Sequence, residues 1–180
     1  MSLSSGRAIL GAFVLAMVVT LGTAVETAVA AADIPPLEER GPFPAAVLGR
    51  LHLFNIQEIM MGKMAEKSGQ SKEARNLGHA LVRDHGTADK RVMALAKRKE
   101  LDVTATGATL EDVHLGKGKK FDRNFAEAVV VDHEKDIAEI KKDREASTDD
   151  ELNVLLDELL PMLEGHVKVA QQILDSTSKQ

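Results

Sequence analysis

The chain has 180 residues, a formal net charge of −5, and no cysteine, tryptophan or tyrosine. The lack of cysteine excludes disulfides, thiolate zinc sites, iron–sulfur clusters and covalently attached haem. A mildly acidic chain without a basic face argues against nucleic-acid binding, and the length suits one domain plus a leader.

The N-terminus has the pattern of an export signal. Arg7 is followed by an uncharged apolar run over residues 8–21, and small residues continue to position 32. We predict that residues 1–32 are a signal peptide, cleaved before Ala31 or Asp33, which implies a periplasmic or secreted protein. The run is short for a spanning helix, which needs about 20 apolar residues. An uncleaved membrane anchor stays an alternative.

Proline and glycine then separate the leader from a periodic region. Four prolines and Gly41 predict a linker over residues 33–44. Apolar residues at three- and four-residue steps predict a helix over 45–68 and a second over 71–99, with Ser71 as its N-cap. Residues 100–118, which contain three glycines, are predicted to be a long connection.

Two more helices complete the pattern. The third is predicted over 119–146, and the fourth begins at the capping-box sequence 148–151 and continues to about residue 176. Four helices without strand patterns predict an all-α fold. The expected architecture is an antiparallel four-helix bundle over residues 45–176.

Each predicted helix carries one metal-capable side chain on its apolar stripe: Glu58, His85, His133 and His166. Such groups are costly to bury unless something binds them. If one turn joined helices two and three, His85 and His133 would each lie about 14 residues from it and therefore level. Glu58 and His166 fall within about 4 Å of that level. We predict that these four residues hold one divalent metal ion.

Aspartates near these positions are candidates for a supporting role. Asp84, Asp122 and Asp132 could accept the far ring N–H of a liganded imidazole, although surface solvation explains Asp132 equally well. Asp89 and Asp136 could ligate a second metal, but their charge-rich context favours a solvated face.

The ligand set restricts the metal without deciding it. Three imidazoles and a carboxylate favour zinc, with iron, manganese and copper as alternatives. Methionines near Glu58 and His166 keep copper open, although methionines at helical spacing usually fill a core. The remaining histidines, His52 and His79, are predicted to face away from the site, and His114 lies in the connection.

Blocks around these positions resemble the bacterial family catalogued as domain of unknown function 4142, over about residues 47–175. The blocks are Glu58 with Met64-Ala65, Val82-Arg83-Asp84-His85, Phe121-Asp122-Arg123, Asp132-His133 and Leu160-Pro161-Met162-Leu163-Glu164-Gly165-His166. The resemblance implies an exported, ferritin-like helical bundle with Glu58, His85, His133 and His166 as the family's acidic and histidine positions. Phe125 stands where the family usually has tyrosine, and the predicted helices lack the Glu-x-x-His pairs that di-iron ferritins carry on two helices, so a ferroxidase centre is not implied.

Three classes of function follow from this pattern. The first is an exported metal-binding protein for storage, buffering or stress response. The second is a metalloenzyme of the oxidase or peroxide-handling kind, which rests on analogy of fold alone. The third is a structural bundle in which the metal only joins the helices. The lack of a nucleophile or a second carboxylate pair favours the first.

Overall fold

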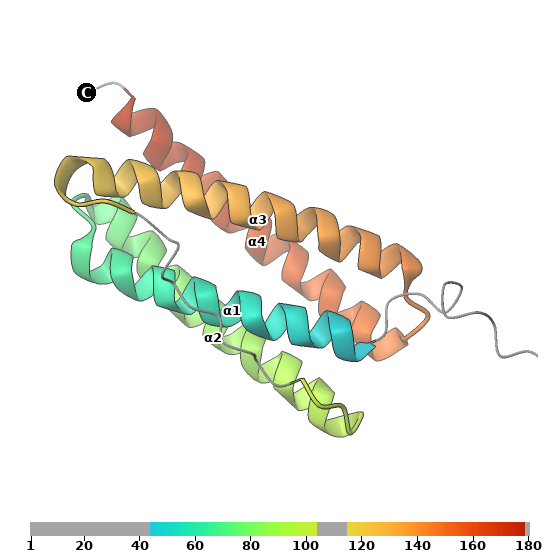
Figure 1. The fold of residues 1–180 in the computed structure, drawn as a ribbon. Helices are drawn as coiled ribbons and strands as arrows, with labels where there is room; N and C mark the ends of the chain where they lie inside the picture. Colours follow the sequence, from blue (N-terminus) through green and yellow to red (C-terminus); the bar gives the residue numbers. More distant parts are fainter. Residues whose placement is uncertain (1–43, 104–114, 179–180) are drawn as a thin grey trace, which may run out of the picture. The chain divides into compact units, whose positions relative to one another are not determined.

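The computed structural model describes residues 44–103 and 115–178, and this part of the chain forms four long helices and no strand. The elements are α1 (Pro44–Ser68), α2 (Lys72–Arg98), the short 3-10 helix η3 (Gly118–Lys120), α3 (Phe121–Ala146) and α4 (Asp150–Thr177). Figure 1 shows the four helices packed as a bundle. The all-α prediction is confirmed, and each helix begins and ends within two residues of its predicted bounds.

Several predictions fall on residues outside this description. They are the leader, the linker apart from Pro44, and the middle of the long connection with His114. Within the described residues, no helix combines the length and the apolar character needed to cross a membrane.

Side-chain caps explain where two helices begin. The Ser71 hydroxyl accepts the backbone N–H of Ala74 at 3.1 Å, as its predicted N-cap role requires. Asp149 caps α4 in the same way, accepting the N–H of Leu152 at 3.1 Å. These caps satisfy backbone donors that have no partner within the helix.

The buried apolar residues form two clusters, which show the direction in which each helix runs. One cluster joins the start of α1, the end of α2, the end of α3 and the start of α4, and the other joins the opposite ends. Consequently α2 and α3 run in the same direction, as Figure 1 shows. The two described ends of the connection lie at opposite ends of the bundle, with Val103 in the first cluster and Leu115 in the second.

This topology corrects the argument from a shared turn between helices two and three. The end of α2 and the start of α3 lie at opposite ends of the bundle, so counting from a common turn is wrong. His85 nevertheless lies midway along α2, and His133 lies near the middle of α3. A residue at a helix midpoint keeps its height whichever way the helix runs, so the two histidines are level.

Candidate metal centre

Three of the four predicted residues meet between the two apolar clusters. His85, His133 and His166 each offer a ring nitrogen, and these nitrogens all lie within 4.8 Å of one another. Nε2 of His133 is 3.3 Å from Nε2 of His85 and 3.2 Å from Nδ1 of His166. Metal–nitrogen bonds of about 2.0–2.1 Å at tetrahedral angles separate two ligand nitrogens by about 3.3 Å. Two of the three nitrogen pairs therefore have the spacing of ligands to one metal ion, and the third pair, His85 with His166, lies within 4.8 Å.

The far nitrogens of two imidazoles are held by acceptors. Nδ1 of His85 lies 2.9 Å from Oδ1 of Asn55, and an amide oxygen can only accept, so this nitrogen carries the proton. Nε2 of His166 donates to Oδ2 of Asp84 at 3.1 Å. In the neutral imidazoles, Nε2 of His85 and Nδ1 of His166 then carry no proton and present a lone pair. Both lone pairs face Nε2 of His133, an arrangement that a cation would stabilise.

Glu58 stands behind this group rather than inside it. Its Oε1 lies 3.8 Å from Nδ1 of His133, the ring nitrogen opposite the one that faces His85 and His166. Among the described residues, Nδ1 of His133 and Oε2 of Glu58 are buried and have no hydrogen-bond partner. Two facing groups that both lack partners could pair if the ring or the carboxyl moved by less than 1 Å.

Phe54 and Asn55 on α1 complete the surroundings, and sequence reasoning assigned neither to the site. The Phe54 ring meets those of His85 and His133 edge to face, with centroids 5.2 and 5.5 Å apart. Asn55 is 2% exposed. It precedes Glu58 by three residues and so lies on the same face of α1. An amide at this position of the apolar stripe was the sequence signal that could have assigned Asn55 to the site.

Burial controls the ionisation of the centre. It lowers the pKa of His133 to about 3, with the nearby His166 adding to the shift. Burial also lowers the pKa of His85 well below its usual value and lowers that of His166, where the hydrogen bond to Asp84 opposes the effect. The pKa of Glu58 is raised well above its usual range by burial and then by Asp132 and Asp136. The imidazoles are therefore neutral near pH 7, the form that binds metals.

Comparison with known proteins places this chain in a family. The family model described as "Domain of unknown function (DUF4142)" matches residues 27–173. The chain belongs to this family. A comparison with curated proteins found no match to this chain.

Two solved structures share the fold of this DUF4142 protein. One is described as "CopM in the apo form", with a TM-score of 0.64, 16% identity, and 74% of this chain and 96% of that chain covered. The other is "CopM in the Cu(II)-bound form", with a TM-score of 0.65, 14% identity, and 76% and 98% covered. At these identities the likeness establishes the helical fold.

The candidate supporting aspartates have different partners. Asp84 contacts His166 on α4 instead of its neighbour His85, because consecutive helical residues point about 100° apart. Asp122 accepts the backbone N–H groups of Gln70 and Ser71, each at 2.7 Å, and so holds the turn between α1 and α2. Only Asp84 therefore has the predicted contact with a ring N–H.

The residues considered for a second metal or for copper lie elsewhere. The three histidines are the only group within the described part of the chain with metal-ligand spacing. Asp89 lies against His52 at 2.5 Å, and His79 lies 2.7 Å from Glu66. Of the methionines, Met61, Met64 and Met162 pack with the two apolar clusters, which is the usual role of methionine at helical spacing.

Asp136 is buried beside Arg50, and burial raises its pKa to about 7 despite that arginine. Glu139 and Asp132 also raise the pKa, whereas Lys135 lowers it. The folded-state pKa of Asp136 exceeds its unfolded value of 3.8, so the folded state holds this proton more tightly than the unfolded state does. The free energy of unfolding therefore falls as the pH rises from about 4 to 7, because the folded state must release the proton.

We therefore expect Asp136→Asn to stabilise the protein above pH 7, by roughly 2–4 kcal/mol, because the amide carries no charge to bury. The gain should shrink toward zero near pH 4, where the wild-type carboxyl is protonated. Urea unfolding at pH 4, 6 and 8 measures this difference. A gain of the same size at all three values would contradict the assigned pKa.

Proposed function

We propose that this protein binds one divalent transition-metal ion through His85, His133 and His166, and that it stores or buffers that metal after export. The observation that carries the proposal is the convergence of three ring nitrogens within 4.8 Å of one another, with the far N–H groups of His85 and His166 held by Asn55 and Asp84. The leader pattern at the N-terminus supports export to the periplasm or exterior.

Buffering, rather than a purely structural metal, is supported by the two apolar clusters. They lie on either side of the histidine layer and contain the large buried side chains of all four helices. Such a core does not depend on the ion for its packing. Three protein ligands also leave the fourth tetrahedral position to water or an incoming ligand, which favours exchange over permanent closure.

Zinc is the favoured metal, and copper is a second candidate supported by a separate observation. Neutral imidazoles suit both ions, while the Irving–Williams order makes Cu(II) the tighter binder at a nitrogen site. The similarity to the Cu(II)-bound form of CopM supports copper, since that protein has the same fold. Affinity alone favours copper, so the metal found in protein from the native compartment distinguishes zinc from copper.

The proposal predicts one metal ion per chain and a folded apo form. Titration of the chelated protein with Zn(II), and separately with Cu(II), should give a stoichiometry of one, and the helical circular dichroism should survive chelation. Metal at about 1,000 times its dissociation constant should add about 4 kcal/mol to the free energy of unfolding. Elemental analysis of protein from its native compartment then identifies the ion.

The control is the triple variant His85→Ala, His133→Ala, His166→Ala. Equal binding by wild type and this variant would refute the proposed site. Loss of helical structure on chelation of the wild type would instead favour a metal that only joins the helices.

Glu58 is proposed to orient His133, so Glu58→Gln should weaken metal binding by about 10–100-fold, the range for groups that support a ligand. Gln has nearly the same shape but cannot ionise, whereas a cation bound beside His133 would favour the ionised form of Glu58 despite its raised pKa. The matched control is Glu66→Gln, because Glu66 contacts the exposed His79 outside the site. Competition with a chromophoric chelator measures both affinities, and equal affinities would contradict the role of Glu58.

A further inference from the structure

The three histidines differ in their access to solvent. His85 and His133 are 0% exposed, and His166 is 5% exposed. On the α1 side, the Phe54 ring packs against both of the fully buried imidazoles. A metal ion therefore has no open approach from α1, and His166 on α4 is the ligand nearest to the surface.

The polar groups behind the histidines differ in the same way. Asn55 and Glu58, which stand behind His85 and His133, are 2% and 1% exposed. Asp84, which accepts the N–H of His166, has a side chain that is 26% exposed. Of these three supporting groups, Asp84 is the one that contacts both a proposed ligand and solvent.

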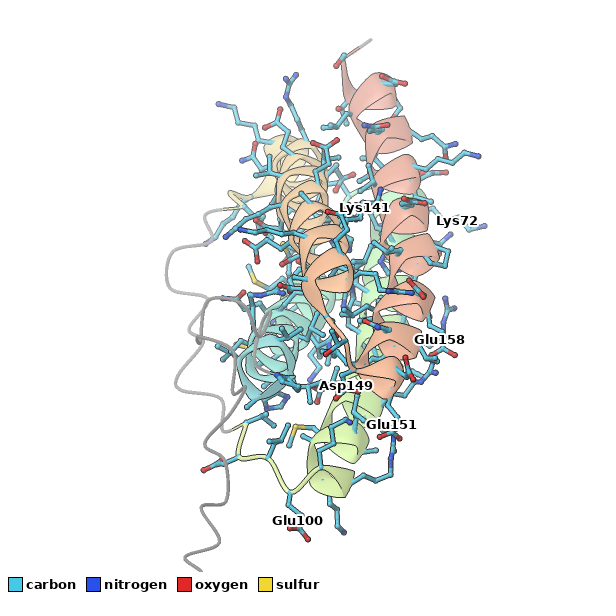
Figure 2. All side chains as sticks on the ribbon, turned by 90° about the vertical axis from the view of Figure 1, so that its right-hand side faces the viewer. Lys72, Glu100, Lys141, Asp149, Glu151 and Glu158 are labelled. Carbon is cyan, nitrogen blue, oxygen red and sulfur yellow. The ribbon has the colours of Figure 1, made fainter. Side chains whose placement is uncertain are left out.

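Asp84 also lines a groove between α2 and α4. The groove has a volume of about 200 Å³ and is bordered by Arg83, Asp84, Thr87 and Ala88 of α2 and by Leu159 and Met162 of α4. A single water needs only about 10–15 Å³ of such space, so the groove admits several water molecules. The ion pair of Arg91 with Glu158, a residue labelled in Figure 2, borders it.

Asp84 is itself held in place by its neighbour. The Nε and Nη2 atoms of Arg83 donate to its two carboxylate oxygens at 2.7 and 2.9 Å, and this contact holds the pKa of Asp84 below its usual value. The ionised carboxylate in turn accepts Nε2–H of His166 at 3.1 Å. While this bond holds, the His166 ring cannot turn, and its Nδ1 stays directed at His133.

We propose that metal reaches and leaves the three-histidine site through the groove between α2 and α4, with His166 as the moving ligand and Asp84 as the latch that holds it. The inference rests on the proposed metal-binding function. When the bond between Asp84 and His166 opens, the ring turns toward the groove, where a hydrated ion can exchange water for imidazole. The Asp84 carboxylate lines the groove and also contacts His166, so it connects the groove to the histidine site.

Obstruction of the groove tests the route in the full chain. Thr87 is exposed and lines the groove two residues after His85, so Thr87→Trp should cover it without entering the core. We expect stopped-flow rates of Zn(II) uptake, and of release to a chelator, each to fall by about tenfold, while the equilibrium dissociation constant changes by less than about twofold. The matched control is Val131→Trp, two residues before His133 and 64% exposed, which should leave both rates unchanged.

A second pair of variants tests the latch. Asp84→Ala and Asn55→Ala each remove the acceptor of one ligand's far N–H, but only Asp84 lies at the groove. Asp84→Ala should accelerate Zn(II) release by about tenfold more than Asn55→Ala. Equal release rates for the two variants would contradict the proposed role of Asp84 in holding His166.

The outcomes separate the route from the function. If Thr87→Trp binds zinc with wild-type affinity and wild-type rates, the route is wrong and the metal site stands. If the wild-type protein itself binds zinc no better than the triple histidine variant, the proposed function fails and the route fails with it.

Discussion

His133→Ala is expected to abolish metal binding at the centre, with affinity for Zn(II) and Cu(II) falling by more than about 100-fold, the upper range for a supporting group. His133 is the middle ligand, because its Nε2 lies 3.3 Å from the nitrogen of His85 and 3.2 Å from that of His166. Its removal leaves two imidazoles and enlarges the space between them. Isothermal titration of the chelated protein measures the loss.

The control for this substitution is His79→Ala. The His79 side chain is 65% exposed and contacts Glu66, so its loss should leave metal affinity unchanged. Helical circular dichroism should be the same for both apo variants, since neither belongs to the apolar clusters. Stoichiometric binding of wild-type strength by His133→Ala would remove the basis of the proposed function.

Gly78→Ala is expected to destabilise the bundle by about 1–3 kcal/mol or more, the cost of overpacking a tight contact. A Cβ added at Gly78 would lie 2.7 Å from the carbonyl oxygen of Gly62 on α1, and one added at Gly62 would lie 2.8 Å from that of Gly78. These obstacles are backbone atoms, so no rotamer change can relieve the contact. The two helices would have to separate, which also disturbs the spacing of Asn55 and His85.

Gly86→Ala in the same helix is the matched control. A Cβ there would meet no atom within 4 Å, so the substitution should stabilise the protein by about 0.5–1 kcal/mol through the better helix propensity of alanine. The free energy of unfolding in urea, measured without metal, compares the two variants. Equal stabilities for Gly78→Ala and Gly86→Ala would show that the close approach of α1 and α2 is unimportant.

Much of the fold could be predicted because helical periodicity is a local property. Apolar residues at three- and four-residue steps place His85, His133 and His166 on inward-facing stripes whatever the arrangement of the helices. The direction of α3 relative to α2 was not accessible in this way, since a long connection can either turn back or cross the bundle. The level of His85 and His133 survived that error because both lie near helix midpoints.

The roles of individual atoms required the tertiary structure. Ring orientation depends on what faces each far nitrogen, and for His85 and His166 that group comes from another helix: Asn55 on α1 and Asp84 on α2. The sequence placed Glu58 on the same face as the histidines, but it could not show which nitrogen of His133 the carboxyl approaches. A small shift between helices is enough to exchange a ligand for a supporting group.

The sequence by itself determined four amphipathic helices, their bounds to within a few residues, and the inward direction of three histidines and one glutamate. Those properties follow from the periodicity and capping of a single segment. Only the tertiary structure decided that three ring nitrogens converge, that Glu58 stands behind them, and that Asp84 connects His166 to a surface groove. These features depend on the distance and rotation between helices, which contacts such as that of Gly62 with Gly78 determine.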